Sequence, residues 1–183
     1  MAGRLVILSG PSGVGKDTLL TAWSARNPVI CRVVAYTTRP MRDHEVDGAD
    51  YHFVSIDRFR EMIAAGAFLE HKEFSGNYYG TPLLGMEALL QQGKVAVLKI
   101  DVQGALTVMP LRPDALTIFV MPPCFEELER RIRSRAADSP EVIERRLQIA
   151  RKEIAEASAY EHVIVNRDVA ESVDSLQSLL SSS

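Results

Sequence analysis

The stretch that decides the fold is Gly10-Pro11-Ser12-Gly13-Val14-Gly15-Lys16-Asp17-Thr18, which follows an apolar run and opens a helical pattern. Its glycines let backbone N–H groups turn inward around a phosphate, the helix adds its positive end, and the lysine reaches the outer phosphates. Strand, spacing and helix match the G-x-x-x-x-G-K part of a P-loop. A glycine-rich turn with a solvated lysine is the alternative, and it explains less of this context. We predict that the whole stretch binds a nucleoside triphosphate.

The P-loop departs from its usual pattern at Asp17, where a Ser or Thr hydroxyl normally binds Mg²⁺. A carboxylate can bind the metal instead, or the hydroxyl of Thr18 can supply the ligand. Beside a polyphosphate the carboxylate repels unless a cation bridges the two groups. We expect Mg²⁺ as the cofactor, with Asp17 or Thr18 as its ligand. We also expect nucleotide binding to depend unusually strongly on the metal.

Short β-rich runs alternate with helical patterns along the rest of the chain. Buried strands of a parallel sheet are predicted at residues 5–9, 30–36, 95–100, 116–120 and 162–166. Helices are expected to begin near Lys16, Pro82, Val102, Phe125, Pro140 and Val169. This alternation is typical of a doubly wound α/β domain, so we predict an α/β core whose parallel sheet is flanked by helices.

One interval breaks the alternation. Residues 51–55, 68–74 and 78–81 have the pattern of short strands around a helix at residues 56–65. We predict a small inserted α+β subdomain at about residues 38–82, within a single domain whose core is residues 1–37 and 83–183. The polar stretch at about residues 134–140 lies between two helical patterns and is a candidate lid.

Charge and composition limit the partners of this chain. A formal net charge of -3 and a pI near 5.8 provide no basic face for nucleic acid. The apolar run at residues 5–9 is too short for a signal segment, and no stretch approaches membrane-spanning length. We expect a cytoplasmic protein with no nucleic-acid or membrane partner. Nothing in the sequence implies a protein partner.

A second group of residues suits a phosphate monoester. Arg39, Arg42 and Tyr51 lie close together in an irregular, glycine-containing segment. Guanidinium groups bind phosphate oxygens through two parallel hydrogen bonds, and a tyrosine hydroxyl adds a neutral donor. Downstream, Glu70 and Asp101 supply carboxylates, and Asp101 follows a predicted strand, where ligands of α/β proteins bind.

Five stretches together resemble guanylate kinase, in order and across nearly the whole chain. They are the P-loop, residues 36–53, residues 68–81, the run Ile-Asp-Val-Gln-Gly at 100–104 and the run Val-Ile-Val-Asn at 163–166. The resemblance implies a P-loop kinase with a GMP-binding insert, which transfers a phosphoryl group from ATP to GMP or dGMP in purine nucleotide metabolism. It assigns the GMP phosphate to Arg39, Arg42, Tyr51 and Tyr79. It assigns the guanine N–H groups to Glu70 and Asp101, guanine O6 to Thr81 and the adenine to Asn166.

The resemblance also maps Arg131, Arg135 and Arg146 onto lid arginines that clamp the ATP phosphates. Phosphoryl transfer needs mainly positioning and charge neutralisation, so these arginines, Lys16 and Arg39 form the expected catalytic set. The ordinary alternative for arginines on such helices is pairing with nearby glutamates. The candidates for that pairing are Glu127, Glu129, Glu141 and Glu144.

Two residues near the acceptor site depart from the family pattern. Ala35 replaces a serine that helps donate to guanine O6, which removes one hydrogen bond. Lys99 replaces an acidic residue in the strand before Asp101. We interpret Lys99 as a salt-bridge partner of Asp17, as an extra phosphate contact, or as a neutral exchange.

Two other functions compete with GMP phosphorylation. Gly-Lys-Asp followed by a hydroxyl residue also resembles the P-loop of ribose bisphosphate kinases, although a sugar phosphate has no need of Glu70, Thr81 and Asp101. Guanylate-kinase-like domains of scaffold proteins keep the fold as a peptide-binding module. The intact P-loop glycines and Lys16 argue against this second alternative.

Overall fold

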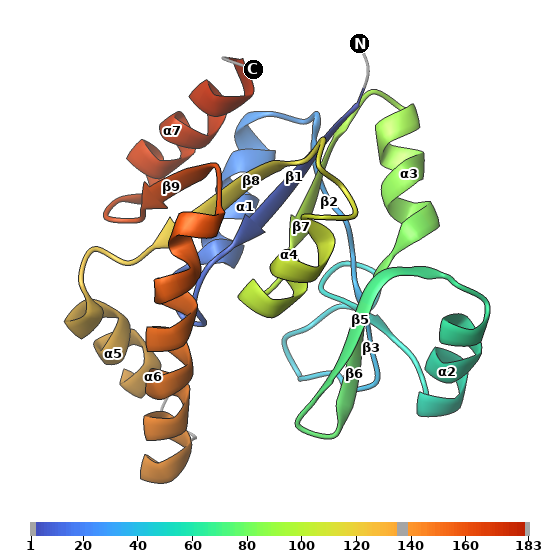
Figure 1. The fold of residues 1–183 in the computed structure, drawn as a ribbon, viewed down its shortest axis with the longest axis horizontal. Helices are drawn as coiled ribbons and strands as arrows, with labels where there is room; N and C mark the ends of the chain where they lie inside the picture. Colours follow the sequence, from blue (N-terminus) through green and yellow to red (C-terminus); the bar gives the residue numbers. More distant parts are fainter. Residues whose placement is uncertain (1–2, 135–138, 182–183) are drawn as a thin grey trace.

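The computed structural model describes residues 3–134 and 139–181. Its elements are β1 Arg4–Ser9, α1 Lys16–Arg26, β2 Ile30–Arg32, β3 Tyr36–Thr37, β4 His52–Phe53, α2 Ile56–Ala64, β5 Phe68–Phe74, β6 Asn77–Pro82, α3 Leu83–Gln91, β7 Val95–Lys99, α4 Val102–Val108, β8 Leu116–Met121, α5 Phe125–Ser134, α6 Pro140–Ala155, a 3-10 turn Glu156–Ala159, β9 His162–Val165 and α7 Val169–Ser181 (Figure 1). Within the described ranges, no helix combines the length and the apolar character needed to span a bilayer.

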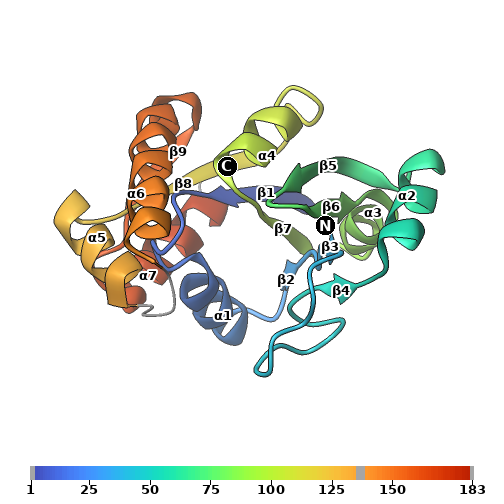
Figure 2. The same ribbon diagram turned by 90° about the horizontal axis from the view of Figure 1, so that it is seen from below.

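The larger sheet is parallel and has five strands in the order β2-β7-β1-β8-β9. Side chains of the central strand β1 alternate between two cores. Val6 and Leu8 pack with residues of α1, α5, α6 and α7, whereas Leu5 and Ile7 pack with residues of α3 and α4. Figure 2 shows α1 and α4 on opposite faces of this sheet. The predicted α/β core with helices on both faces is confirmed, and each predicted helix start lies within one residue of the observed one.

The prediction of one strand over residues 30–36 is wrong. β2 ends at Arg32, and after Val33 donates to the Val97 carbonyl at 2.9 Å the chain leaves the parallel sheet. Tyr36 instead pairs with Gly80 of β6 and His52 of β4 in a second sheet. An apolar run cannot reveal this change, because either sheet buries the same kinds of side chain.

The second sheet has the strand order β4-β3-β6-β5 and carries α2. Phe59 of α2 is fully buried, and its ring stacks on Phe68 at 4.5 Å and on Tyr78 at 5.4 Å between centroids. A Cβ on Gly80 would lie 2.7 Å from the Phe68 ring, so the strand needs glycine there. The insert therefore has its own small aromatic core, beside the larger one. In Figure 1 the insert and the α5–α6 pair flank the lower end of β1.

Replacing Phe59 with alanine should destabilise the protein by about 3–5 kcal/mol, because a large aromatic side chain leaves a cavity between two rings. Phe74→Ala is the matched control, since Phe74 is 51% exposed and its loss should change stability by less than about 0.5 kcal/mol. Denaturant unfolding of the two variants measures the difference. Equal losses would contradict the assignment of Phe59 as the core of the insert.

Candidate active site

The predicted P-loop stretch connects the end of β1 to the first turn of α1, at the carboxyl edge of the parallel sheet. Gly10 has a φ of 140°, and a Cβ there would lie 2.3 Å from the Val120 carbonyl oxygen of β8. Gly15, with a φ of 101°, caps α1, and a Cβ there would lie 2.7 Å from Asn166 Nδ2. The loop can therefore approach its neighbours only because both positions lack a side chain.

Lys16 folds back over the loop that precedes it. Its Nζ donates to the Gly10 carbonyl and, at 3.1 Å, to the Pro11 carbonyl. Arg146 reaches the same loop from α6, where its Nη2 donates to Ser12 Oγ at 3.1 Å. Two of the predicted catalytic cations thus lie against the P-loop.

The Val14 carbonyl of the loop accepts two side-chain hydrogen bonds. It accepts from Asn166 Nδ2 at 2.8 Å and from Arg131 Nη1 at 3.2 Å. Asn166 is only 5% exposed, so in this structure its amide supports the loop, and its contact with adenine stays a prediction. Arg135 lies outside the described residues, as does most of the predicted lid, residues 135–138.

The helix arginines pair with glutamates, as the ordinary alternative predicts, but Arg131 also reaches the P-loop. Glu127 accepts from Arg131 at 2.7 Å and from Arg130 at 2.8 Å, and these bonds lower the pKa of Glu127 to about 2. Glu129 pairs with Arg133 in solvent. Glu127 therefore stays ionised and fixes the direction of the Arg131 side chain.

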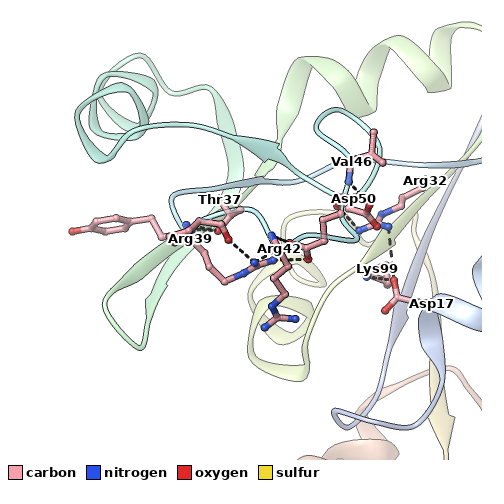
Figure 3. Close-up of polar contacts among 11 residues, drawn as sticks. Asp17, Arg32, Thr37, Arg39, Arg42, Val46, Asp50 and Lys99 are labelled. Carbon is pink, nitrogen blue, oxygen red and sulfur yellow. Dashed lines mark hydrogen bonds and ion pairs between the residues drawn. The ribbon is translucent and has the colours of Figure 1, made fainter. Parts of the chain in front are cut away.

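Asp17 forms ion pairs with Lys99 and, at 3.7 Å, with Arg32, both through Oδ1 (Figure 3). Partial loss of solvation opposes ionisation of this carboxyl, but Lys99, Arg32 and Lys16 outweigh it, so the pKa of Asp17 lies below its usual value. Lys99 is 12% exposed, and burial lowers its pKa. Arg32 also donates to the Asp50 carbonyl at 2.6 Å and lies 5.8 Å from the Tyr51 ring. The salt bridge proposed for Lys99 is present, and Arg32, which pairs with the same carboxylate, extends the contact to the insert.

A cluster of one arginine and two tyrosines marks the phosphate end of the insert. Arg39 donates to both oxygens of Glu45, at 2.7 and 2.9 Å, and Glu45 also accepts from the Arg42 N–H at 2.9 Å. The Arg39 guanidinium lies 5.6 Å from the Tyr51 ring, whose centroid is 6.1 Å from that of Tyr79. Burial raises the pKa of Tyr51, so its hydroxyl remains a donor at neutral pH.

Two carboxylates converge at the base end. A Cβ on Gly104 would lie 3.3 Å from Asp101 Oδ1 and 3.5 Å from Glu70 Oε2. Asp101 caps α4 by accepting from the Gly104 N–H at 2.9 Å, and its other oxygen pairs with Lys72. Thr81 Oγ1 donates to Glu70 Oε1 at 2.7 Å. The residues predicted to recognise the base are thus brought together, although they come from different sheets.

Sequence reasoning missed three residues of this site. Glu45 orients Arg39, Arg32 connects Asp17 to the insert, and Lys72 pairs with Asp101. Glu45 lies inside the arginine-containing segment, and Lys72 lies two positions after Glu70 on the same strand. Alternation along a strand was therefore the available signal for Lys72.

Three features together define a P-loop kinase. They are the parallel sheet, the P-loop after its central strand, and the arginines that contact that loop. A crystal structure of shikimate kinase from Bacteroides thetaiotaomicron has the same fold, with a TM-score of 0.54 over 97% of this chain and 98% of that one. At 17% identity this similarity shows the fold alone.

The sequence model described as guanylate kinase matches residues 2–183. A guanylate kinase of Nostoc sp. is 51% identical over 92% of this chain and 84% of its own. The crystal structure of guanylate kinase from Anaplasma phagocytophilum is 36% identical and has a TM-score of 0.78 over 98% of this chain and 85% of that one. The chain belongs to the guanylate kinase family.

Glu45→Gln should lower the free energy of unfolding at neutral pH by about 1–3 kcal/mol, because Arg39 keeps a weaker partner in a half-buried site. Hydrogen bonds from Arg39 lower the pKa of Glu45 from 4.5 to about 2. The stability that this carboxylate contributes is therefore present above about pH 4.5 and is lost as the pH falls toward 2.

Urea unfolding at several pH values tests this expectation. The difference between wild type and Glu45→Gln should shrink as the solution becomes more acid. Glu61→Gln is the control, because Glu61 pairs with Arg58 in solvent and its side chain is 66% exposed. A difference that stays constant from pH 7 to about pH 2.5 would contradict the role given to the ionised carboxylate.

Proposed function

We propose that the residues described above carry out the ATP:GMP phosphotransferase reaction of the guanylate kinase family, with ATP on the P-loop and GMP between the insert and α4. The observation that carries the residue assignment is the convergence of Glu70 and Asp101 at Gly104. Guanine presents N1–H and N2–H₂ as neighbouring donors, and two carboxylates accept from both. Adenine would leave these acceptors unpaired, so the same pair favours guanine over adenine.

The P-loop binds the ATP phosphates through its backbone N–H groups and the first turn of α1. Lys16 exchanges the Gly10 and Pro11 carbonyls for phosphate oxygens, which are stronger acceptors because they are charged. Arg131 and Arg146 already lie on P-loop atoms, so they need only short movements to neutralise the transferring group. Residues 38–82 exclude water from that group when they close over it.

The GMP phosphate lies against Arg39, Arg42, Tyr51 and Tyr79. Glu45 and the Pro40 carbonyl occupy three N–H groups of Arg39, and the remaining two, Nε–H and one Nη2–H, are shared between Tyr79 and a phosphate. An arginine held in this way presents a fixed pair of donors rather than a mobile charge. That arrangement directs the phosphate oxygen of GMP toward the γ-phosphorus of ATP.

Asp17 and Thr18 fit a Mg²⁺ ion. Both ion pairs of Asp17 involve Oδ1, which leaves Oδ2 as a ligand, and Thr18, the next residue of α1, is exposed. Magnesium in kinases takes one or two protein oxygens, with phosphates and water completing its shell. When bound, the ion neutralises phosphate charge. Lys99 offsets the negative charge that Asp17 adds, which supports the aspartate as a tolerated replacement for Ser or Thr.

The two competing functions are weaker. Asp17 is the residue that favours a sugar-phosphate kinase, and its pairing with Lys99 explains it without a change of substrate. The identity to a guanylate kinase over 92% of the chain favours an enzyme over a binding module. A cytoplasmic location remains part of this proposal.

ADP release from ATP and Mg²⁺ should be rapid with GMP and slow with AMP, CMP, UMP and ribose 1,5-bisphosphate. Glu70→Gln should lower kcat/KM for GMP at least about tenfold, since it replaces an acceptor by a partial donor and costs about 1.4 kcal/mol or more. Turnover with the sugar phosphate and none with GMP would overturn the proposed substrate.

ATP affinity with and without Mg²⁺ tests the Asp17–Lys99 pair. Asp17→Ser should bind ATP more tightly than wild type in the absence of metal, because a carboxylate beside the phosphates is removed. Lys99→Met should weaken metal-free binding, and less so in the Asp17→Ser background, with a coupling of about 0.5–1 kcal/mol. Titration calorimetry on the four proteins measures this cycle. The same Mg²⁺ dependence in all four would rule out the role of the pair.

A further inference from the structure

We propose that Lys72 is a further catalytic residue, whose ammonium pairs with Asp101 in the empty enzyme and binds the reacting phosphates once guanine occupies Asp101. This proposal rests on the function proposed above, because it requires GMP as the acceptor. Neither the P-loop nor the lid contributes this lysine. It comes from β5 of the insert.

The register of β5 and β6 places Lys72 on the ligand-binding face. Glu70 pairs with Thr81 and Lys72 pairs with Tyr79 across the two antiparallel strands. Paired residues project to the same face, as do residues two apart on one strand. The bond from Thr81 to Glu70 shows that this face carries the base end of the site. Lys72 therefore lies one step toward the phosphate end, opposite a tyrosine assigned to the GMP phosphate.

The ion pair of Lys72 competes with guanine. The Lys72 ammonium contacts Oδ2 of Asp101, while Oδ1 accepts from the Gly104 N–H. Both oxygens of this carboxylate therefore have a partner before the base arrives. The guanine N–H groups assigned to Asp101 must displace the lysine or share Oδ2 with it. Because Lys72 is on the insert and Asp101 is on the core, the pair also holds the two parts together.

The surroundings of Lys72 connect it to the P-loop. Burial lowers its pKa, while Glu70 and Glu153 act in the opposite direction. Glu153 of α6 interacts with the P-loop. The Lys16 ammonium and the Ser12 N–H both favour its charged form, whereas burial opposes that form and raises its pKa. Among the described residues, Oε2 of Glu153 is buried without a hydrogen-bond partner. The charge of Lys72 is thus favoured by two carboxylates, Glu70 on the insert and Glu153 on α6.

A displaced ammonium in this position turns to the nearest strong anions. The Lys72 side chain is 29% exposed, so water replaces a lost partner only in part, and a lysine stem is flexible enough to redirect its charge. With GMP and ATP bound, those anions are the GMP phosphate and the γ-phosphoryl group. The GMP oxygen forms the new bond to the γ-phosphorus, and the bond to the bridging oxygen breaks with its electron pair left on ADP. Lys72 keeps its proton and neutralises charge on the oxygens of the transferring group.

This arrangement couples base recognition to the rate of transfer. An acceptor whose base offers Asp101 no N–H leaves Lys72 on that carboxylate and away from the phosphates. For such acceptors kcat is therefore lower, and KM higher, than for GMP. If the lysine acted only as a latch between insert and core, it would affect GMP binding and leave kcat alone.

Lys72→Met tests the proposal, with Lys72→Arg as the conservative variant and Lys94→Met as the control. Lys94 donates to the Pro28 carbonyl at 3.4 Å and directly precedes β7, at the edge of the parallel sheet opposite the P-loop. Steady-state kinetics should show kcat with GMP falling about 10- to 100-fold in Lys72→Met, with KM for ATP nearly unchanged and partial recovery in Lys72→Arg. Lys94→Met should behave as wild type.

Calorimetry with guanosine, which has the base without the phosphate, measures the competition directly. Guanosine should bind several-fold more tightly to Lys72→Met than to wild type, because Oδ2 of Asp101 then has no competing cation. Circular dichroism and the thermal midpoint establish that the variant is folded. Wild-type kcat in a folded Lys72→Met would overturn the catalytic role, and unchanged guanosine affinity would overturn the competition. Absence of GMP turnover in wild type itself would instead defeat the proposed function, and this proposal with it.

Discussion

The close approach of the P-loop to β8 and to Asn166 is the constraint on which the rest of the structure depends. Gly10 meets the Val120 carbonyl and Gly15 meets the Asn166 amide at distances that no Cβ would allow. The same amide holds the Val14 carbonyl, so the loop keeps its shape before any phosphate arrives. A loop shaped in advance loses little conformational entropy when it binds, which is why its backbone N–H groups can serve as a phosphate site.

Three of the cations assigned to phosphates are paired with a carboxylate or with backbone carbonyls. Arg39 is paired with Glu45, Arg131 with Glu127, and Lys16 with the carbonyls of its own loop. Several like charges facing one anion site would repel one another, and these partners offset that repulsion until the nucleotides bind. Glu45 and Glu127 pair with arginines that keep further donors for a ligand, so they position rather than block.

Two departures from the family pattern, Asp17 and Lys99, compensate each other. The carboxylate that Asp17 adds beside the phosphates is offset by Lys99, and Arg32 extends this pair to the Asp50 carbonyl of the insert. Lys72 likewise pairs with a carboxylate, Asp101, which is assigned to the base, and this pair joins the insert to the core. The Arg32–Asp50 and Lys72–Asp101 contacts thus connect the two parts at the donor and acceptor sites.

Local signals were enough to predict the class of fold, the P-loop and the helix starts, because strand periodicity, glycine spacing and capping are properties of neighbouring residues. They failed at residues 30–36, where one apolar run serves two sheets and only the pairing partners distinguish them. Glu70 and Asp101 were recognised through resemblance, yet their meeting at Gly104 depends on how β5 packs beside α4. The pairing of Lys72 with Asp101 likewise joins residues far apart in the chain. The sequence thus determined which groups are present, and the tertiary structure decided which of them neutralise one another, because Coulomb energy depends on distance in space rather than along the chain.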